Sequence, residues 1–147
     1  MINTEVNSID EIINIIKTSK KQIYRFDTDS NKNTASKKEV LNNLQKFKNF
    51  CESELGLSSK NIDPDYSGIN SEYYKGSLKI SDIMYSYRLI SYNAPEIRLK
   101  LLIFNMFKNP QLLEITYQLW VGNDRLISTN DFNVFESKFK EWLEEDN

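Results

Sequence analysis

The chain of 147 residues has 19 basic and 21 acidic residues, no histidine and one cysteine. This composition excludes histidine-based acid–base catalysis, histidine-ligated metals, an internal disulfide and a cysteine-cluster zinc site. A net charge of −2 gives no basic surplus of the kind that nucleic-acid-binding proteins carry, so direct nucleic-acid binding is disfavoured.

The length fits one domain, residues 1–147, that can bury a core without metals or cross-links. The N-terminus lacks a basic region followed by an apolar core, and the longest unbroken apolar run is Leu101–Phe104. We therefore expect neither secretion nor a membrane span, and place the protein in the cytoplasm. Fifteen lysines against four arginines, with abundant Asn and Ile, indicate AT-rich codons and hence a low-GC bacterium, a phage or another AT-rich genome as the source.

An amphipathic helix is predicted near the N-terminus. Ser8 can cap it, and isoleucines recur along one of its faces. We end this helix near Gln22, although residues 23–26 could be either its continuation or a short strand. The polar stretch Asp27–Ala35 has no period and is expected to be a loop.

A second helix is predicted from its capping box, Ser36 and Glu39, to Gly56. Cys51 lies on the apolar stripe of this helix, where we expect a small buried side chain and no reactive thiol. The connection Leu57–Ser71 has no period, and a loop of that length is often functional or mobile.

The middle of the chain alternates between apolar and polar residues, which is the pattern of half-buried strands. Short turns separate these segments, so neighbouring strands must be antiparallel. The predicted sheet is a meander of four strands and a short fifth: Glu72–Ile80, Ile83–Tyr92, Glu96–Phe107, Gln111–Val121 and Arg125–Thr129.

A last helix is predicted to open at Ser128, with Asp131 three residues later, and to carry a heavy aromatic stripe. The fold class is therefore α+β, with two N-terminal helices, an antiparallel four- to five-stranded meander, and a C-terminal helix packed on the sheet. The apolar stripes of the helices should cover the face that carries Leu99, Leu101 and Tyr117.

Carboxylates are the remaining candidates for catalysis or metal binding. Asp27–Asn31 superficially resembles a calcium-binding loop, but lysine stands where that loop needs glycine and again where it needs its last glutamate. Asp63 and Asp65 flank a proline and are typical of a turn. The four glycines are too dispersed for a phosphate-binding loop. We expect no enzymatic activity, no metal and no cofactor.

The polar face of the predicted sheet is the leading candidate for a binding site. Large aromatic side chains and arginine mix on it, as they do in binding hot spots. The candidates are Trp120, Gln118, Phe104, Arg88, Arg98 and Tyr92. Two alternatives remain: a helix covers this face, or the face curves around a small ligand with Trp120, Phe104 and Arg88 as its floor.

Charge is distributed unevenly along the chain. Residues 72–108 hold six basic and three acidic residues, whereas residues 109–147 hold three basic and eight acidic ones. An acidic surface that includes Glu141, Glu144 and Glu145 could attract a basic partner such as a toxin or nuclease, or could simply be a solvated helix face.

These observations favour a protein that binds another protein, as an inhibitor, immunity or anti-defence factor of a bacterium or phage does. A small-ligand-binding module is the alternative, and an enzyme that relies on carboxylates, tyrosines and lysines comes third.

Overall fold

The structure is a computed structural model that describes residues 4–5, 8–18, 23–25, 34–63, 67–69, 83–89, 95–104 and 113–145. Its elements, in chain order, are β1 (Thr4–Glu5), α1 (Ile9–Thr18), β2 (Ile23–Arg25), β3 (Thr34–Ser36), α2 (Lys37–Asn49), η1 (Phe50–Glu54), η2 (Ser59–Asn61), β4 (Gly68–Ile69), β5 (Ile83–Leu89), β6 (Ile97–Phe104), β7 (Leu113–Val121), β8 (Asp124–Thr129) and α3 (Phe132–Glu145).

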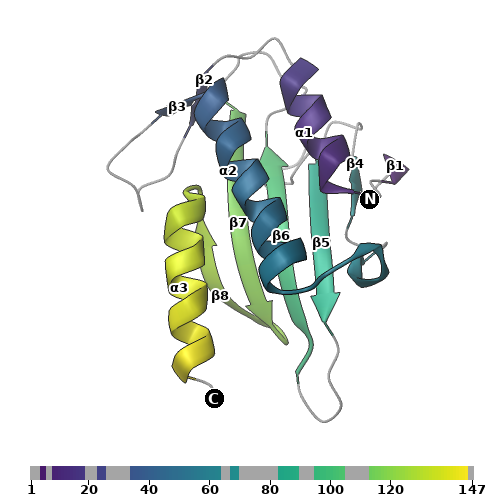
Figure 1. Cartoon of the computed structure of the whole chain (residues 1–147), viewed down its shortest axis with the longest axis vertical. Helices are drawn as coiled ribbons and strands as arrows, with labels where there is room; N and C mark the ends of the chain where they lie inside the picture. Colours follow the sequence, from purple (N-terminus) through teal and green to yellow (C-terminus); the bar gives the residue numbers. More distant parts are fainter. Residues whose placement is uncertain are drawn as a thin grey trace, which may run out of the picture.

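One sheet forms the back of the molecule, and α1, α2 and α3 all lie on the same side of it (Figure 1). The strand order is β1-β4-β5-β6-β7-β2-β3, and β8 also pairs with β7. The predicted α+β class is confirmed, with helices before the central strands and one after them. No described helix is long and apolar enough to cross a membrane.

The central strands β5, β6, β7 and β8 pair in sequence order and antiparallel, as the meander predicts. The predicted strand Glu72–Ile80 lies outside the described residues. The sheet is nevertheless not a pure meander, because β2 joins it parallel to β7, with Tyr24 opposite Leu113. Of the two alternatives for residues 23–26, the strand is observed for Ile23–Arg25, and Phe26 lies outside the described residues.

The predicted loop Asp27–Ala35 is corrected at its end, because Thr34 and Ala35 belong to β3 and pair with β2. The capping box of α2 is confirmed: Ser36 Oγ accepts from the Glu39 backbone N–H at 3.2 Å, and Glu39 Oε1 accepts from the Ser36 N–H at 3.3 Å. Beyond α2 the chain makes a π-helical turn, and Gly56 ends it with a φ of 69°, a conformation that glycine adopts without strain.

The predicted start of the last helix is wrong by a few residues. Ser128 lies in β8 opposite Gln118, and Asp131 caps α3 instead by accepting from the Asn133 N–H at 2.9 Å. Residues 127–129 form a strand instead of the first turn of the helix because pairing with β7 buries Ile127 and Thr129. The connection Leu57–Ser71 also holds more structure than expected, namely η2 and β4.

The core lies between the helices and the odd-numbered residues of β5, β6 and β7, which we call the inner face. Tyr85, Tyr87, Leu99, Leu101, Ile115, Tyr117 and Leu119 are all buried there. At its centre Phe47 of α2 contacts Tyr117, with ring centroids 5.3 Å apart, and lies 6.1 Å from Phe135 of α3. The predicted packing of the apolar stripes on this face is confirmed.

Candidate binding surface

The even-numbered residues of the central strands form the opposite side of the sheet, the outer face. No described helix lies on it (Figure 1). Its members are Met84, Ser86 and Arg88 of β5, Arg98, Lys100, Leu102 and Phe104 of β6, Glu114, Thr116, Gln118 and Trp120 of β7, and Arg125 and Ser128 of β8. Alternation alone places these side chains together, because successive residues of a strand point to opposite faces.

Trp120 is half-buried on the outer face, and its neighbours hold it in a defined orientation. Its indole N–H donates to Gln118 Oε1 at 2.8 Å, and Gln118 Nε2 donates to Ser128 Oγ at 3.2 Å. The ammonium of Lys100 lies over the indole ring, 4.7 Å from its centroid. The indole N–H is thus directed along the sheet, and contacts within the chain fix the orientation of the ring.

Lys100 is partly desolvated and lies near both Arg98 and Asp63. Burial lowers its pKa first, the neighbouring Arg98 guanidinium lowers it further, and Asp63 opposes both effects. The shift therefore reflects mainly the loss of hydration of this ammonium, with a smaller contribution from Arg98.

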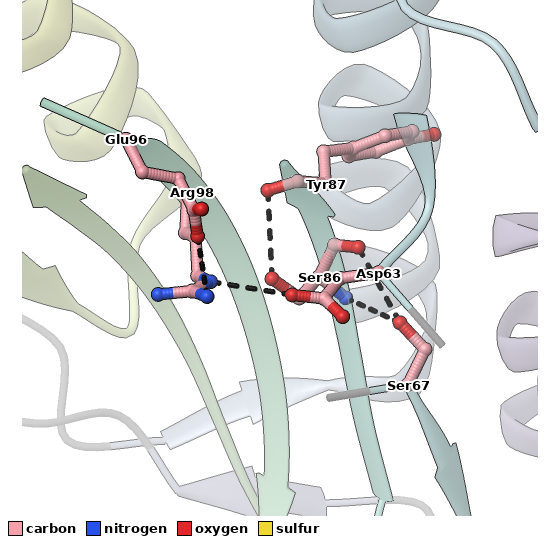
Figure 2. Close-up of polar contacts among 6 residues, drawn as sticks. All are labelled: Asp63, Ser67, Ser86, Tyr87, Glu96 and Arg98. Carbon is pink, nitrogen blue, oxygen red and sulfur yellow. Dashed lines mark hydrogen bonds and ion pairs between the residues drawn. The ribbon is translucent and has the colours of Figure 1, made fainter. Parts of the chain in front are cut away.

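Arg98 is held between two carboxylates. Its Nε donates to Asp63 Oδ2 at 3.3 Å, and its Nη2 forms an ion pair with Glu96 (Figure 2). The side chain of Asp63 is 1% exposed and that of Arg98 22% exposed, so this network is largely removed from water. A buried carboxylate is tolerated only when a countercharge and hydrogen bonds compensate its lost hydration.

The segment after η2 brings Asp63 to this position by pairing with the edge of β5. Ile62 forms a bridge with Tyr87, and the Asp63 N–H donates to the Ser86 carbonyl at 2.9 Å. The Ser86 N–H in turn donates to Ser67 Oγ at 2.9 Å, so a side chain replaces a backbone partner at this point (Figure 2). The buried pair therefore ties the chain that precedes β5 to β6.

Four large side chains form a row across the outer face. In the strand register Arg88 lies opposite Arg98, Arg98 opposite Trp120, and Trp120 opposite Arg125. A bulge in β8 sets the last pair, because Leu119 faces Ile127 whereas Trp120 faces Arg125, and Leu126 is left as the extra residue. Without this bulge, Leu126 would stand opposite Trp120 and Arg125 would point to the other face.

The structure brings together part of the predicted site. Arg88, Arg98, Gln118 and Trp120 are neighbours, but Phe104 lies six residues from Arg98 along β6, which corresponds to about 20 Å. A small-ligand floor that combined Trp120, Phe104 and Arg88 would have to span that distance. Tyr92 lies outside the described residues.

The acidic candidates lie elsewhere. Glu141, Glu144 and Glu145 are exposed on α3, which packs against the inner face. The candidate set is therefore divided between the two sides of the molecule.

Asp63 is the residue whose role the sequence did not reveal. We weighed it with Asp65 as a turn or an acid–base pair, and the structure shows it paired with Arg98, 35 positions away in sequence. Asp65 and the calcium-like stretch Asp27–Asn31 lie outside the described residues. No three metal-ligating side chains come together in the part of the chain that the structure describes. Cys51 is fully buried, and burial raises the pKa of its thiol well above the usual value.

Comparisons of the chain with models of protein families, with characterised proteins and with solved structures find no significant match. The functional argument therefore depends on the geometry of the outer face.

Proposed function

We propose that the protein acts by binding another protein through the outer face, as a cytoplasmic inhibitor, immunity or anti-defence factor of a bacterium or phage. The observation that carries this proposal is the fixed indole of Trp120, half-buried on a sheet face without a described helix and flanked by arginines. Tryptophan and arginine are the residues most enriched in the energetic centres of protein interfaces.

The rigidity of the site supports binding in preference to catalysis. Hydrogen bonds orient Trp120 and Gln118, and two carboxylates hold Arg98, so little side-chain freedom remains to be lost on association. The buried carboxylate of Asp63 is committed to Arg98 and is 1% exposed, which leaves it poorly placed to take a proton from a substrate.

A basic partner, such as a toxin or nuclease, is a second candidate and would use a different surface. The exposed carboxylates Glu141, Glu144 and Glu145 favour it, because they would attract positive charge to α3. A small-ligand-binding module remains the alternative from another class, and a thermal shift with a metabolite would favour it.

Affinity capture with the purified chain, followed by titration of the captured protein, tests these proposals. We would compare the wild type with Trp120→Ala, with Lys138→Gln as a folded surface control, and with a variant that carries Glu141→Lys, Glu144→Lys and Glu145→Lys. Outer-face binding predicts that Trp120→Ala weakens the complex by at least tenfold, about 1.4 kcal/mol, while the control binds normally.

The two surfaces give opposite outcomes in this experiment. Loss of binding in the triple glutamate variant alone would move the site to α3 and support the basic partner. Equal binding by all variants would contradict both surfaces, and the fold of each variant would be checked by circular dichroism.

A further inference from the structure

We propose that the outer face recognises an acidic segment of its partner, with two carboxylates bound by Arg88 and Arg125 and an apolar side chain between them on Trp120. This inference rests on the proposed function and specifies the chemistry of the partner. The argument has three parts: the charge available at the site, its spacing, and the bulge that creates it.

The accessible charge around Trp120 is positive. Asp63 and Glu96 lie in the same part of the outer face and both pair with Arg98, so these three groups together carry one negative charge. Arg88, Lys100 and Arg125 add three positive charges and leave the surroundings of Trp120 positive. Arg88 is half-buried and Arg125 exposed, and neither forms an ion pair with another described residue. With Lys100 over the indole ring, the site presents cations on both sides of an aromatic surface.

The spacing of these cations defines the ligand. Arg88 and Arg125 are separated by three neighbouring strand positions, or about 14 Å. Residues i and i+4 of an extended chain are about 13 Å apart and point to the same side, and residue i+2 lies between them. An extended acidic segment with an apolar residue at its centre therefore matches the row of Arg88, Arg98, Trp120 and Arg125.

The bulge in β8 gives an independent argument. It turns Arg125, instead of the apolar Leu126, toward Trp120, and leaves Leu126 as the exposed large hydrophobic residue among those described. Bulges are often found where a strand must redirect a side chain for function. Here the redirected group is the cation that completes the row.

A protein segment fits this site better than a nucleic acid does. Nucleic-acid binding uses many phosphate contacts on a surface with a basic surplus, whereas this chain has a net charge of −2 and only a few cations around one tryptophan. A short carboxylate-bearing segment needs only the cations that are present, and arginine binds carboxylates in a planar, bidentate geometry.

The test uses synthetic peptides and amide NMR on the intact chain. The probe is an end-blocked peptide Ser-Glu-Ser-Leu-Ser-Glu-Ser, and the controls are the same peptide with lysine for glutamate and a single-stranded thymidine oligonucleotide. We expect the glutamate peptide to shift the indole signal of Trp120 and the amides of β6–β8 in a saturable, salt-sensitive manner, and the lysine peptide to leave them unchanged.

Matched substitutions locate the contacts. Arg88→Gln and Arg125→Gln should each weaken the glutamate peptide about two- to fivefold, as expected for partly exposed ion pairs, and the double variant should weaken it about tenfold. Lys138→Gln on α3 makes the same change in net charge on the other side of the molecule and should have no effect.

Three results would overturn the inference: equal shifts with the lysine peptide, unchanged affinity in the double arginine variant, or tighter binding of the oligonucleotide than of the glutamate peptide. Titration of the same variants with the captured partner protein distinguishes failure of this inference from failure of the proposed function. If Trp120→Ala abolishes its binding while Arg88→Gln and Arg125→Gln do not, protein binding at the outer face stands and the acidic segment is wrong. If Trp120→Ala has no effect, the outer face itself is wrong.

Discussion

The inner and outer faces of the sheet are built from alternate residues of the same strands, yet they are organised in different ways. On β6, Leu99 and Leu101 are almost completely buried in the core, whereas Arg98 and Lys100, which alternate with them, remain half-buried on the other side. The inner face is held by packing of aromatic and aliphatic side chains. On the outer face, directional contacts fix the side chains: ion pairs to Arg98, and hydrogen bonds that orient Trp120.

The two faces should therefore contribute differently to the stability of the fold and to the specificity of any binding. Burial on the inner face stabilises the fold whichever large apolar residues fill the space, because hydrophobic burial is non-directional. The outer face places particular charges around an indole, and such placement contributes mainly to specificity. Changes on the inner face should therefore lower the stability most, and under the proposed function changes of the exposed outer-face side chains should lower binding.

The largest fall in the free energy of unfolding is expected at alkaline pH, because the inner-face tyrosines are buried and resist ionisation. Burial raises the pKa of Tyr85 to about 12 and raises those of Tyr87 and Tyr117 further. Between pH about 10 and 12 the unfolded chain loses these protons while the folded chain keeps them, so the free energy of unfolding falls as the pH rises. Three groups at about 1.4 kcal/mol per pH unit give a loss of about 4 kcal/mol by pH 11.

Urea unfolding at a series of pH values measures this loss. The double variant Tyr85→Phe, Tyr87→Phe should show about one third of the slope of the wild type, since one of the three buried phenols among the described residues remains. A slope that does not change in this variant would contradict the assignment.

The next largest loss of stability should distinguish two adjacent leucines that point to opposite faces. Leu101 is 1% exposed within the core cluster, whereas Leu102 is 8% exposed on the outer face and lies outside that cluster. Leu101→Ala should lower the free energy of unfolding by about 3 kcal/mol through lost transfer energy and a residual cavity. Leu102→Ala should cost roughly half as much in the same urea titration. Equal losses would show that the outer face is a second core.

A third effect concerns the ion pair that joins Asp63 to Arg98. Asp63→Asn keeps the shape of the side chain but removes the negative charge beside Arg98, and we expect the free energy of unfolding to fall by about 2 kcal/mol. The pair Lys48–Asp10, 2.8 Å apart, is the control because the Asp10 side chain is 64% exposed, and Asp10→Asn should change the free energy of unfolding by no more than about 0.5 kcal/mol. Similar losses at both sites would mean that burial does not strengthen the Asp63 contact.

The smallest effect on stability is expected from Trp120→Ala. The substitution removes a hydrogen bond to Gln118 and the contact with Lys100, which together contribute about 1 kcal/mol. A thermal or urea titration beside the binding measurement checks this value. A loss as large as that of Leu101→Ala would place Trp120 in the core and weaken its assignment to a binding surface.

Local patterns in the sequence determined much of this protein. Alternation assigned Leu101 to the core and Trp120 to the opposite side, and the Ser36–Glu39 capping box located the start of α2. Both features depend on residues within a few positions of one another, so they can be predicted from the local sequence. The same alternation predicted that Arg98 and Trp120 lie on one face of the sheet, as the strand register shows.

Contacts between residues that are far apart in the sequence became known only from the tertiary structure. The parallel pairing of β2 with β7, the contact of Asp63 with Arg98, and the separation of Phe104 and the α3 glutamates from Trp120 all depend on strand order and register. The bulge in β8 turns Arg125 toward Trp120, and no residue pattern in the sequence marks its position. Because one extra residue changes which side chains share a face, alternation alone could not assign Arg125 to the outer face. Such contacts result from the balance of burial and pairing over the whole chain, which no local pattern records.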